Sequence, residues 1–307
     1  MARSAKSVLV RVPASTSNLG SGFDTLGLAV HLHTHVRVTL AADKAIDIVS
    51  PIRDEERAGA QAIVEKAAVE FFQRSHSAPF GIKISLQSNV PVARGLGYSA
   101  TVRLGVVAGL NALSETGWNR DQLLDLITAL EGHPDNASPA IFGGFTVSGM
   151  VKQTVRCLKF RVSPELKLIT LIPRFKVSTE KARSLLPERL GRADAAHGLN
   201  RAALITAAFA AKNYEALSGL FDDRVHQPYR ETLIPQLTSV IRAGEGAGAI
   251  GGFLSGSGSA IICLTLERSQ AVASAMKKES PDSQVEILSA NNAGFQIVRK
   301  ASGKGGD

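Results

Sequence analysis

The order of strand-like and helix-like segments constrains the fold of this chain more than any single motif. Residues 7–12 (SVLVRV) and 26–40 (LGLAVHLHTHVRVTL) alternate apolar and polar side chains and are rich in β-branched residues, which predicts two strands. Residues 57–74 (RAGAQAIVEKAAVEFFQR) place apolar side chains at helical spacing, which predicts a helix. The first half continues with predicted strands at 80–88, 141–149 and 153–162 and with helices that end near Leu113 and cover 119–132. This order is not the regular alternation of a doubly wound parallel sheet.

A different order begins near residue 165. A buried-looking strand at 166–173 is followed by helices at 178–186, at 195–213 and from Tyr229 to Arg242. A strand, a glycine-rich turn and a strand then fill 248–266, before a helix at 269–279 and a strand at 284–288. This order predicts a ferredoxin-like lobe with extra helices inserted. We expect one lobe at 1–163, a second at 164–300 that shares an interface with it, and a disordered glycine-rich tail at 301–307.

Composition narrows the class of protein. The chain has 307 residues, of which 44% are hydrophobic, so it can bury a substantial core. No apolar run is long enough for a membrane span or a signal-peptide core, so we expect a cytoplasmic protein. The two cysteines, Cys157 and Cys263, lack partners at metal-ligand spacing and are expected to be core residues.

The chain carries a formal charge of +8, but its Lys and Arg residues are scattered and only 5% of its residues are aromatic. A nucleic-acid-binding surface needs clustered basic residues, often with aromatic side chains on which bases stack. We therefore expect no nucleic-acid partner, and we interpret the positive balance as solvation with attraction for an anionic small substrate.

The stretch PVARGLGYSA (91–100) places two glycines immediately before a predicted helix. The first N–H groups of a helix lack internal partners and attract anions, and glycines let the backbone close around a phosphate. The stretch is neither a P-loop, because no lysine follows the glycines, nor a dinucleotide fingerprint, because the third glycine is missing. Alone, it is more often an ordinary turn into a helix.

Three further stretches concentrate polar residues or glycines beyond what turns require. They are VPASTSNLGSGFDTLGLAV (12–30), EGHPDNASPAIFGG (131–144) and GGFLSGSGSAIICL (251–264). Each has an ordinary explanation as turn chemistry. Together with the loop at 91–100 they indicate a functional site.

These four stretches, in this order, resemble the motifs of the GHMP small-molecule kinases. VSTEKARSLLP (177–187) and DRVHQPYRETLIP (223–235) are similar to the subgroup that acts on homoserine, and the resemblance covers residues 8 to about 298. It implies an α+β fold of two lobes, the first like the second domain of ribosomal protein S5 with a left-handed βαβ unit, the second ferredoxin-like. It also implies ATP-dependent phosphorylation of the side-chain hydroxyl of L-homoserine in threonine biosynthesis, and a homodimer.

The resemblance implies a role for each motif. ATP would bind the loop Pro91, Val92, Ala93, Arg94, Gly95, Leu96, Gly97, Tyr98, Ser99, Ala100 and Thr101, and Mg²⁺ would bind Ser99 and Glu131. Arg183 and Arg230 would grip the homoserine carboxylate, since a guanidinium fork suits that task. Asp24 would receive the ammonium group, and Asn18, His133 and Asn136 would surround the reacting hydroxyl. Glu131, Asn136 and Arg183 are the residues expected to act in catalysis. Asp135 is the other nearby carboxylate, and no proton acceptor is assigned.

The chain departs from the family pattern at two places. Tyr98 stands where the family loop usually has serine, and SGSGSA (255–260) stands where SGAGPT is usual. The tyrosine ring could point outward, stack on the nucleotide or obstruct it. Two alternatives therefore stay open: a kinase of the same fold for another small alcohol, and a non-catalytic ligand-binding relative whose nucleotide site Tyr98 has altered.

Overall fold

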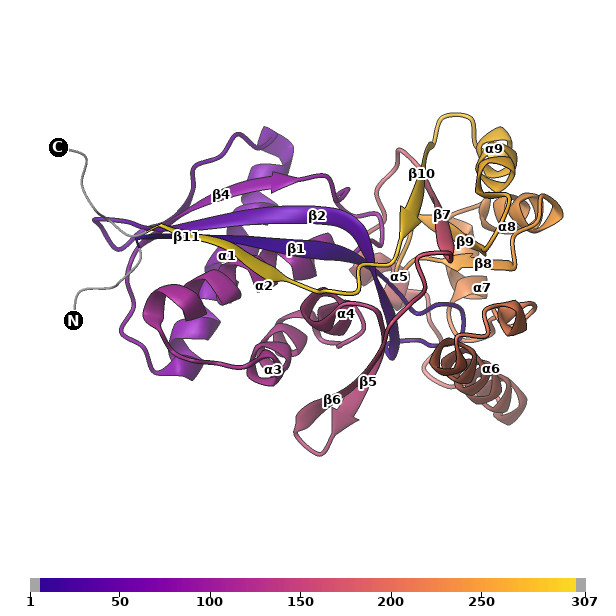
Figure 1. Cartoon of the computed structure of the whole chain (residues 1–307), viewed down its shortest axis with the longest axis horizontal. Helices are drawn as coiled ribbons and strands as arrows, with labels where there is room; N and C mark the ends of the chain where they lie inside the picture. Colours follow the sequence, from indigo (N-terminus) through magenta and orange to yellow (C-terminus); the bar gives the residue numbers. More distant parts are fainter. Residues whose placement is uncertain (1–5, 302–307) are drawn as a thin grey trace.

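The computed structural model describes residues 6–301 and consists of two lobes, each built on one β-sheet (Figure 1). The first lobe begins with two long strands, as the alternating pattern predicts. Its elements are β1 (Ser7–Ser17), β2 (Leu26–Leu40), β3 (Ile46–Ile48), α1 (Asp54–Ser75), β4 (Ile82–Ser88), α2 (Tyr98–Ser114), α3 (Arg120–Glu131), α4 (Ala137–Phe142), β5 (Phe145–Val151) and β6 (Thr154–Phe160). Helix α3 starts with a capping box between Asn119 and Gln122, which confirms the predicted N-cap.

The second lobe follows the predicted ferredoxin-like order. Its elements are β7 (Lys167–Ile172), α5 (Thr179–Ser184), α6 (Arg192–Ala211), α7 (Gln227–Arg230), α8 (Leu237–Gly246), β8 (Gly251–Leu254), β9 (Ile261–Thr265), α9 (Ser269–Glu279) and β10 (Gln284–Ser289), with short 3₁₀ turns at Glu215–Leu217 and Glu231–Leu233. Its four strands form an antiparallel sheet in the order β10-β7-β9-β8. The last strand of the described chain, β11 (Gln296–Ala301), belongs to the sheet of the first lobe.

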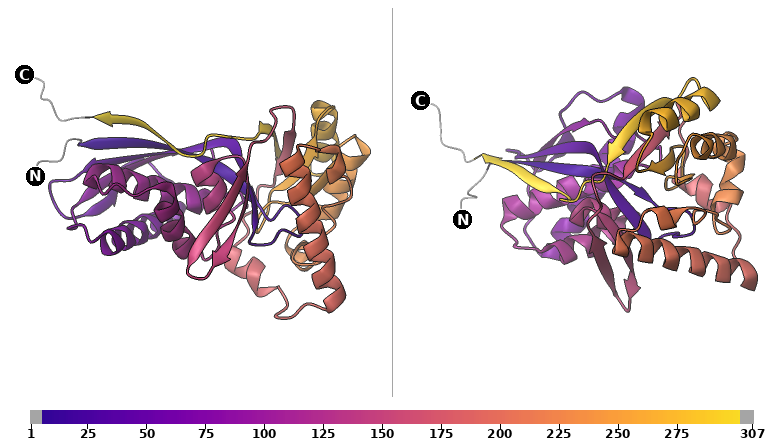
Figure 2. Two further views of the ribbon diagram at one scale, coloured as in Figure 1. Left: turned by 60° about the horizontal axis from the view of Figure 1, so that its bottom comes forward. Right: turned by 45° about the vertical axis from the view of Figure 1, so that its right-hand side comes forward.

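The sheet of the first lobe has seven strands. Its main path is β11-β1-β2-β4-β3, and the hairpin β5–β6 joins it through β2. The unit β3-α1-β4 is parallel, whereas the other pairs are antiparallel. Helices α1 to α4 lie on one face of this sheet (Figure 2), because alternate residues such as Val10, Val36 and Val38 are apolar and buried against them.

An apolar cluster joins the two lobes and confirms the predicted shared interface. It contains Leu26 and Phe145 from the first sheet together with Leu168 and Phe253 from the second. The rings of Phe145 and Phe209 stack with their centroids 4.1 Å apart. A shared core of this kind fixes the lobes relative to each other, and it therefore fixes the cleft between them.

The structure differs from the sequence-based predictions in four places. The helix expected from Tyr229 to Arg242 is broken into α7, a 3₁₀ turn and α8, because Pro235 lacks an N–H group and disfavours helical backbone before it. The strand expected at 141–149 starts at 145, after α4. The strand β3 was not predicted.

The fourth correction concerns the C-terminal end. Strand β11 was not predicted, and it pairs with β1 in the sheet of the first lobe, so the second lobe ends short of the expected residue 300. The expected tail at 301–307 starts with Ala301, which is the last residue of β11, and 302–307 lie outside the described residues.

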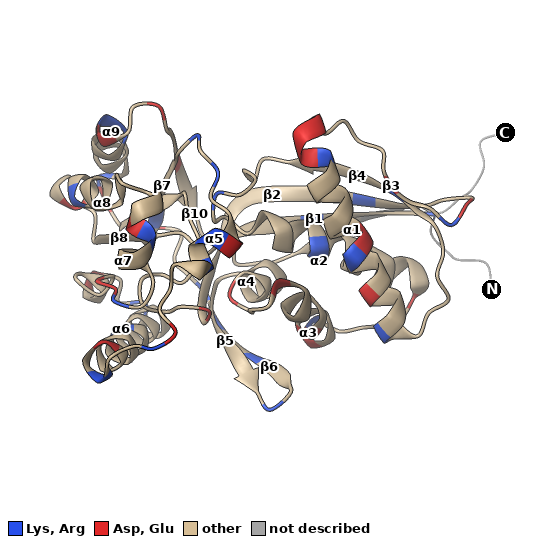
Figure 3. Ribbon diagram, turned by 180° about the vertical axis from the view of Figure 1, so that it is seen from behind, with Lys and Arg blue, Asp and Glu red and all other residues tan. Residues whose placement is uncertain are grey.

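The distribution of charged residues and the state of the cysteines agree with the interpretation of the composition. Lys, Arg, Asp and Glu are interspersed over the helices of both lobes on the side seen in Figure 3. Both cysteines are free thiols, Cys263 buried and Cys157 half-buried. Within residues 6–301, no helix combines the length and apolar character needed to cross a bilayer.

Candidate active site

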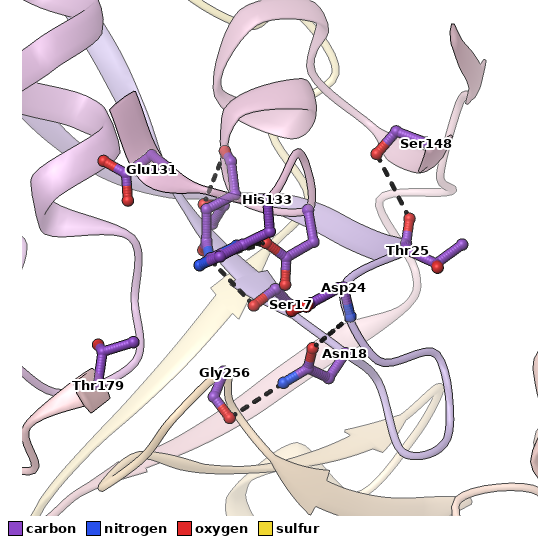
Figure 4. A network of polar contacts seen from close by, with 12 residues as sticks. Ser17, Asn18, Asp24, Thr25, Glu131, His133, Ser148, Thr179 and Gly256 are labelled. Atoms are coloured by element: carbon purple, nitrogen blue, oxygen red, sulfur yellow. Dashed lines mark hydrogen bonds and ion pairs between the residues drawn. The ribbon is translucent and has the colours of Figure 1, made fainter. Parts of the chain in front are cut away.

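A cavity of about 530 Å³ lies between the lobes and gathers the polar motifs of the sequence. Its wall includes the loop before α2, the first turns of α1, the segment after α3, helix α5 and the glycine turn between β8 and β9. Figure 4 shows residues from these segments converging, with Glu131 and His133 on one side and Asn18, Asp24 and Gly256 on the other.

The glycines of the loop before α2 are required by close packing. Gly95 has φ of +73°, and a Cβ added there would lie 2.0 Å from the backbone oxygen of Ser255. The Ser255 hydroxyl donates to the Gly95 carbonyl at 2.7 Å, so the two glycine-rich turns hold each other. Gly97 is the N-cap of α2 with φ of +69°, and no side chain caps this helix. The uncapped start of α2 therefore faces the cavity with backbone N–H groups available to an anion.

Most, but not all, of the predicted nucleotide loop lines the cavity. Val92 to Ser99 do so, whereas Pro91, Ala100 and Thr101 are not among the described lining residues. The Thr101 hydroxyl is fully buried and lies 2.7 Å from that of Thr34 on β2. The Arg94 guanidinium donates to the Pro173 carbonyl at 2.8 Å. Arg94 and Thr101 thus fasten the loop and its helix to the protein.

The side chain of Tyr98 is partly buried between the lobes. It packs against the core of the first lobe and against the cluster between the lobes, and it also lines the cavity. Burial, and then the nearby charge of Glu56, raises the pKa of its phenol, which keeps it protonated. The ring therefore forms part of the cavity wall and does not point outward into solvent.

The two predicted metal ligands are neighbours. The Ser99 hydroxyl donates to Oε2 of Glu131 at 2.9 Å, and Oε1 of Glu131 forms an ion pair with Arg103. The Glu131 side chain is only 8% exposed. A hydroxyl and a carboxylate oxygen side by side at the mouth of the loop match the one or two protein ligands that Mg²⁺ takes when it also binds phosphates.

A hydrogen-bond network holds His133 and Asn136 in the segment after α3. Nδ1 of His133 hydrogen-bonds to the buried carboxylate of Asp135. Burial opposes the imidazolium charge, but this bond and the charge of Asp135 outweigh it and raise the pKa of His133. The Asn136 amide donates to the Ser17 hydroxyl at 3.0 Å and accepts from the Ser15 hydroxyl at 3.0 Å. Both side chains thus have fixed orientations at the cavity wall.

The hairpin between β1 and β2 supplies Asn18 and Asp24. The Asn18 amide donates to the Gly256 carbonyl at 3.1 Å and accepts from the backbone N–H of Asp24 at 3.1 Å (Figure 4). The Asp24 carboxylate binds the Arg183 guanidinium through two contacts, of 2.5 and 3.1 Å. Arg183, predicted to grip a substrate carboxylate, is therefore paired with a protein carboxylate in this structure.

Arg230 is held rigidly in the floor of the cavity. It is 1% exposed; Nη1 donates to the Gly256 carbonyl at 2.9 Å and Nε to the Ala182 carbonyl at 3.3 Å. Burial, and then the charge of Arg183, lowers its pKa to about 10, so it stays charged at neutral pH. Among the described residues its Nη2 has no hydrogen-bond partner and it forms no ion pair, which leaves a cationic donor for a ligand.

His226 orients Arg230 from behind. Its Nε2 lies 2.9 Å from the Gly20 carbonyl, which only accepts, so Nε2 carries the proton. Nδ1 then accepts from Nη1 of Arg230 at 3.1 Å. Burial is the main cause that lowers the pKa of His226, which favours this neutral form.

Sequence reasoning missed several residues of the site: Ser15, Ser17, Arg103, Asp223 and His226. Asp223 accepts from three backbone N–H groups at 2.7 to 2.9 Å and so fixes the turn into α7. The signal for His226 was present, because it lies four residues before Arg230 and hence on the same side of a helical turn. Arg103 could have been found in the same way, because it lies four residues after Ser99 on the same side of α2.

Comparison with known proteins agrees with this fold. Residues 62–144 match the GHMP kinases N terminal domain and residues 205–282 the GHMP kinases C terminal domain. The chain belongs to the GHMP kinase family, whose members use ATP as the phosphate donor.

Within that family, homoserine kinases are among its relatives. It is 37% identical to the homoserine kinase of Moorella thermoacetica, over 94% of this chain and 99% of that one, and 36% identical to that of a Synechococcus strain, over 95% and 98%. A homoserine kinase structure from Cytophaga hutchinsonii superposes with a TM-score of 0.87 at 26% identity and covers 97% of this chain and 99% of its own. The mevalonate kinase of Methanococcus jannaschii, with a TM-score of 0.67 at 16% identity over 92% of this chain and 98% of its own, shares the fold.

Proposed function

We propose that this protein transfers the γ-phosphoryl group of ATP to the side-chain hydroxyl of L-homoserine, giving O-phospho-L-homoserine and ADP for threonine biosynthesis. One observation carries the proposal. The same cavity presents an uncapped helix start at Gly97 and a buried guanidinium, Arg230, whose Nη2 has no partner in the described part of the chain. The first suits a triphosphate and the second a small carboxylate.

The start of α2 and the loop before it would hold the phosphates of ATP. Phosphoryl transfer asks a protein mainly for alignment and charge neutralisation. Backbone N–H groups at a helix start supply both, because they are fixed and carry partial positive charge. The packing of Gly95 against Ser255 keeps this arrangement rigid before ATP binds.

Ser99 and Glu131 would hold Mg²⁺, since their oxygens already lie 2.9 Å apart beside the loop. When bound, the ion neutralises the charge that develops on the phosphate oxygens. The Arg103 guanidinium pairs with Oε1 of Glu131 and so holds Oε2 toward Ser99.

Homoserine is a zwitterion, and Asp24, Arg183 and Arg230 match its charges. Arg230 is fixed in place and would bind the carboxylate through Nη2. Arg183 and Asp24 now bind each other, and a zwitterion would separate them by offering its carboxylate to one and its ammonium group to the other. Both guanidinium groups lie over the Phe23 ring, at 5.2 and 5.4 Å from its centroid, so the ring keeps the two cations on one side.

Asn18, His133 and Asn136 would surround the reacting hydroxyl. The raised pKa of His133 favours the imidazolium, which donates hydrogen bonds and does not accept a proton. His133 would thus bind a substrate oxygen, and the hydroxyl proton would pass to an oxygen of the phosphoryl group as that group is transferred and ADP leaves. We assign no protein base.

The test is homoserine-dependent release of ADP by the purified chain with Mg·ATP, with the product identified by ³¹P NMR. A panel of other small alcohols, including mevalonate and sugars, tests the alternative of a different acceptor. Calorimetry with Mg·ATP tests the non-catalytic alternative. Binding of ATP without turnover of any acceptor would contradict the proposal, and absence of ATP binding would favour a relative whose nucleotide site Tyr98 has altered.

The expected homodimer, the cytoplasmic location and the lobe boundary near residue 163 stay predictions. Light scattering on the purified chain would measure its mass in solution. A mass equal to the 32.4 kDa of one chain would contradict the dimer.

A further inference from the structure

Three histidines project from the same face of strand β2. His31, His33 and His35 alternate with buried residues along the strand, and His31 is exposed whereas His33 and His35 are half-buried. The opposite face of the strand carries Val36 and Val38, against which helix α2 packs. The histidines therefore lie on the face of the seven-stranded sheet that helices α1 and α2 do not cover (Figures 1 and 2).

The spacing of the imidazole rings suits two ligands of one ion. Two imidazoles on a tetrahedral ion, with nitrogen–metal distances of about 2.0–2.1 Å, have their ring centres about 5 Å apart. The ring centroids of His31 and His33 are 5.8 Å apart, and those of His33 and His35 are 6.4 Å apart. Small rotations of the two side chains would bring the rings of His31 and His33 to the spacing that one ion requires. His31 and His35 are about 13 Å apart along the strand, so His33 is the member that both pairs share.

The electrostatic surroundings favour one of the two pairs. Arg11 on β1 lies directly opposite His35 in the sheet, and its positive charge opposes a cation at the His33–His35 end. Burial, then Arg11 and the neighbouring histidines, lower the pKa of His33 to about 4, so its ring is neutral at physiological pH and has a lone pair. None of the ion pairs described for residues 6–301 involves these three histidines.

One existing contact would have to be replaced. Oδ1 of Asn291 accepts from the backbone of Ala293 and Gly294, so its Nδ2 donates to Nε2 of His33, at 3.2 Å. A neutral hydrogen bond of this kind contributes little net stability, because both groups bond to water when it is broken. That is a small cost beside a metal–imidazole bond.

We propose that His31 and His33 form a surface site for a borderline transition-metal dication such as Zn²⁺, Ni²⁺ or Cu²⁺, completed by water, with His35 as a weaker alternative partner of His33. Imidazole nitrogens prefer these ions over Mg²⁺, so the magnesium needed for phosphoryl transfer does not compete. The site is separate from the cavity between the lobes, because none of the three histidines lines that cavity.

The experiment is calorimetric titration of the full chain with Zn²⁺, and separately with Ni²⁺, in excess Mg²⁺. His33→Ala should weaken binding by roughly 10²-fold, the lower end of the gain from joining two ligands. His31→Ala should also weaken it, whereas His35→Ala should change it little. Arg11→Gln should tighten it. The matched control is His76→Ala, which removes an exposed histidine at the end of α1.

A second measurement guards against misfolding of the His33 variant. Zn²⁺ should raise the melting temperature of the wild type, and the rise should be smaller in the double variant His31→Ala/His35→Ala, which leaves one imidazole. Any Zn²⁺ taken up by Asp24, His133 and Asp135, whose ligand atoms lie within 4.8 Å of one another in the cavity, would be common to all variants, so differences between variants report on β2. Equal affinity of wild type and the His33 variant, or an equal loss in the His76 variant, would overturn the proposal.

Discussion

Replacing His226 by leucine tests whether Arg230 is positioned from behind. Leucine fills a similar volume but removes both nitrogens, so the Gly20 carbonyl loses its donor and Nη1 of Arg230 loses the acceptor at 3.1 Å. Arg230 keeps the carbonyls of Gly256 and Ala182. The guanidinium is thus retained in the cavity but held by fewer contacts.

The size of the effect follows from the lost contact. A hydrogen bond to a charged group contributes about 1.5–3 kcal/mol. At about 1.4 kcal/mol for each factor of ten, homoserine binding should weaken by roughly 10- to 150-fold. The substrate carboxylate is bound equally in the ground and transition states, so KM for homoserine should rise while kcat changes little.

The assay is coupled detection of ADP with homoserine and ATP varied separately. KM for ATP is the internal control, since His226 does not line the cavity beside the nucleotide loop. His226→Gln should restore part of the loss, because the glutamine side-chain carbonyl can accept a hydrogen bond from Arg230. If His226 only filled space, the leucine and glutamine variants would behave alike. Unchanged KM for homoserine in a folded leucine variant would refute the reasoning, and so would an equal rise in both KM values.

Four further perturbations follow from the geometry. Tyr98→Ser should lower the free energy of unfolding by about 1–3 kcal/mol without lowering KM for ATP, because the ring packs between the lobes; denaturant titration and steady-state kinetics measure the two. Gly95→Ala should abolish ATP binding in calorimetry, because the new Cβ would lie 2.0 Å from a backbone oxygen. Glu131→Gln should lower kcat by roughly 10²-fold or more and raise the Mg²⁺ concentration needed for half activity. The control is Glu65→Gln, which removes the charge of an exposed carboxylate on α1. The raised pKa of His133 stabilises the fold fully below pH 6.5, and this contribution is lost as the pH rises through the folded-state pKa. The unfolding free energies of wild type and His133→Gln should therefore converge toward alkaline pH. A difference that stays constant with pH would contradict this.

The parts of the fold that were predictable are those written locally in the sequence. The alternation in β1 and β2 and the Asn119 cap depend on neighbouring residues alone, and the structure confirms them. The helix predicted to follow 91–100 is present as α2, but it begins three residues earlier, at Tyr98 directly after Gly97. A binding loop formed by one short segment can be predicted from sequence, because its backbone conformation is set by a few neighbouring residues.

The errors came from elements that long-range contacts decide. β3 has only three residues and exists because it pairs in parallel with β4. β11 returns to β1 across nearly the whole chain, so no local pattern assigns it to the first lobe. The pairing of Asp24 with Arg183 joins residues 159 positions apart, and spacing cannot reveal it.

Arg183 and Arg230 look equivalent in the sequence, but the structure gives them different physical properties. Arg230 is 1% exposed and donates to three fixed acceptors, so moving it would leave buried polar groups without partners. The side chains of Arg183 and Asp24 are 36% and 32% exposed, and ion pairs at such sites contribute only about 0–1 kcal/mol. Opening that pair therefore costs a zwitterionic substrate little. Under the proposed function, Arg230 would serve as a fixed anchor that sets where the carboxylate lies, and Arg183 on the short helix α5 would exchange Asp24 for the substrate carboxylate.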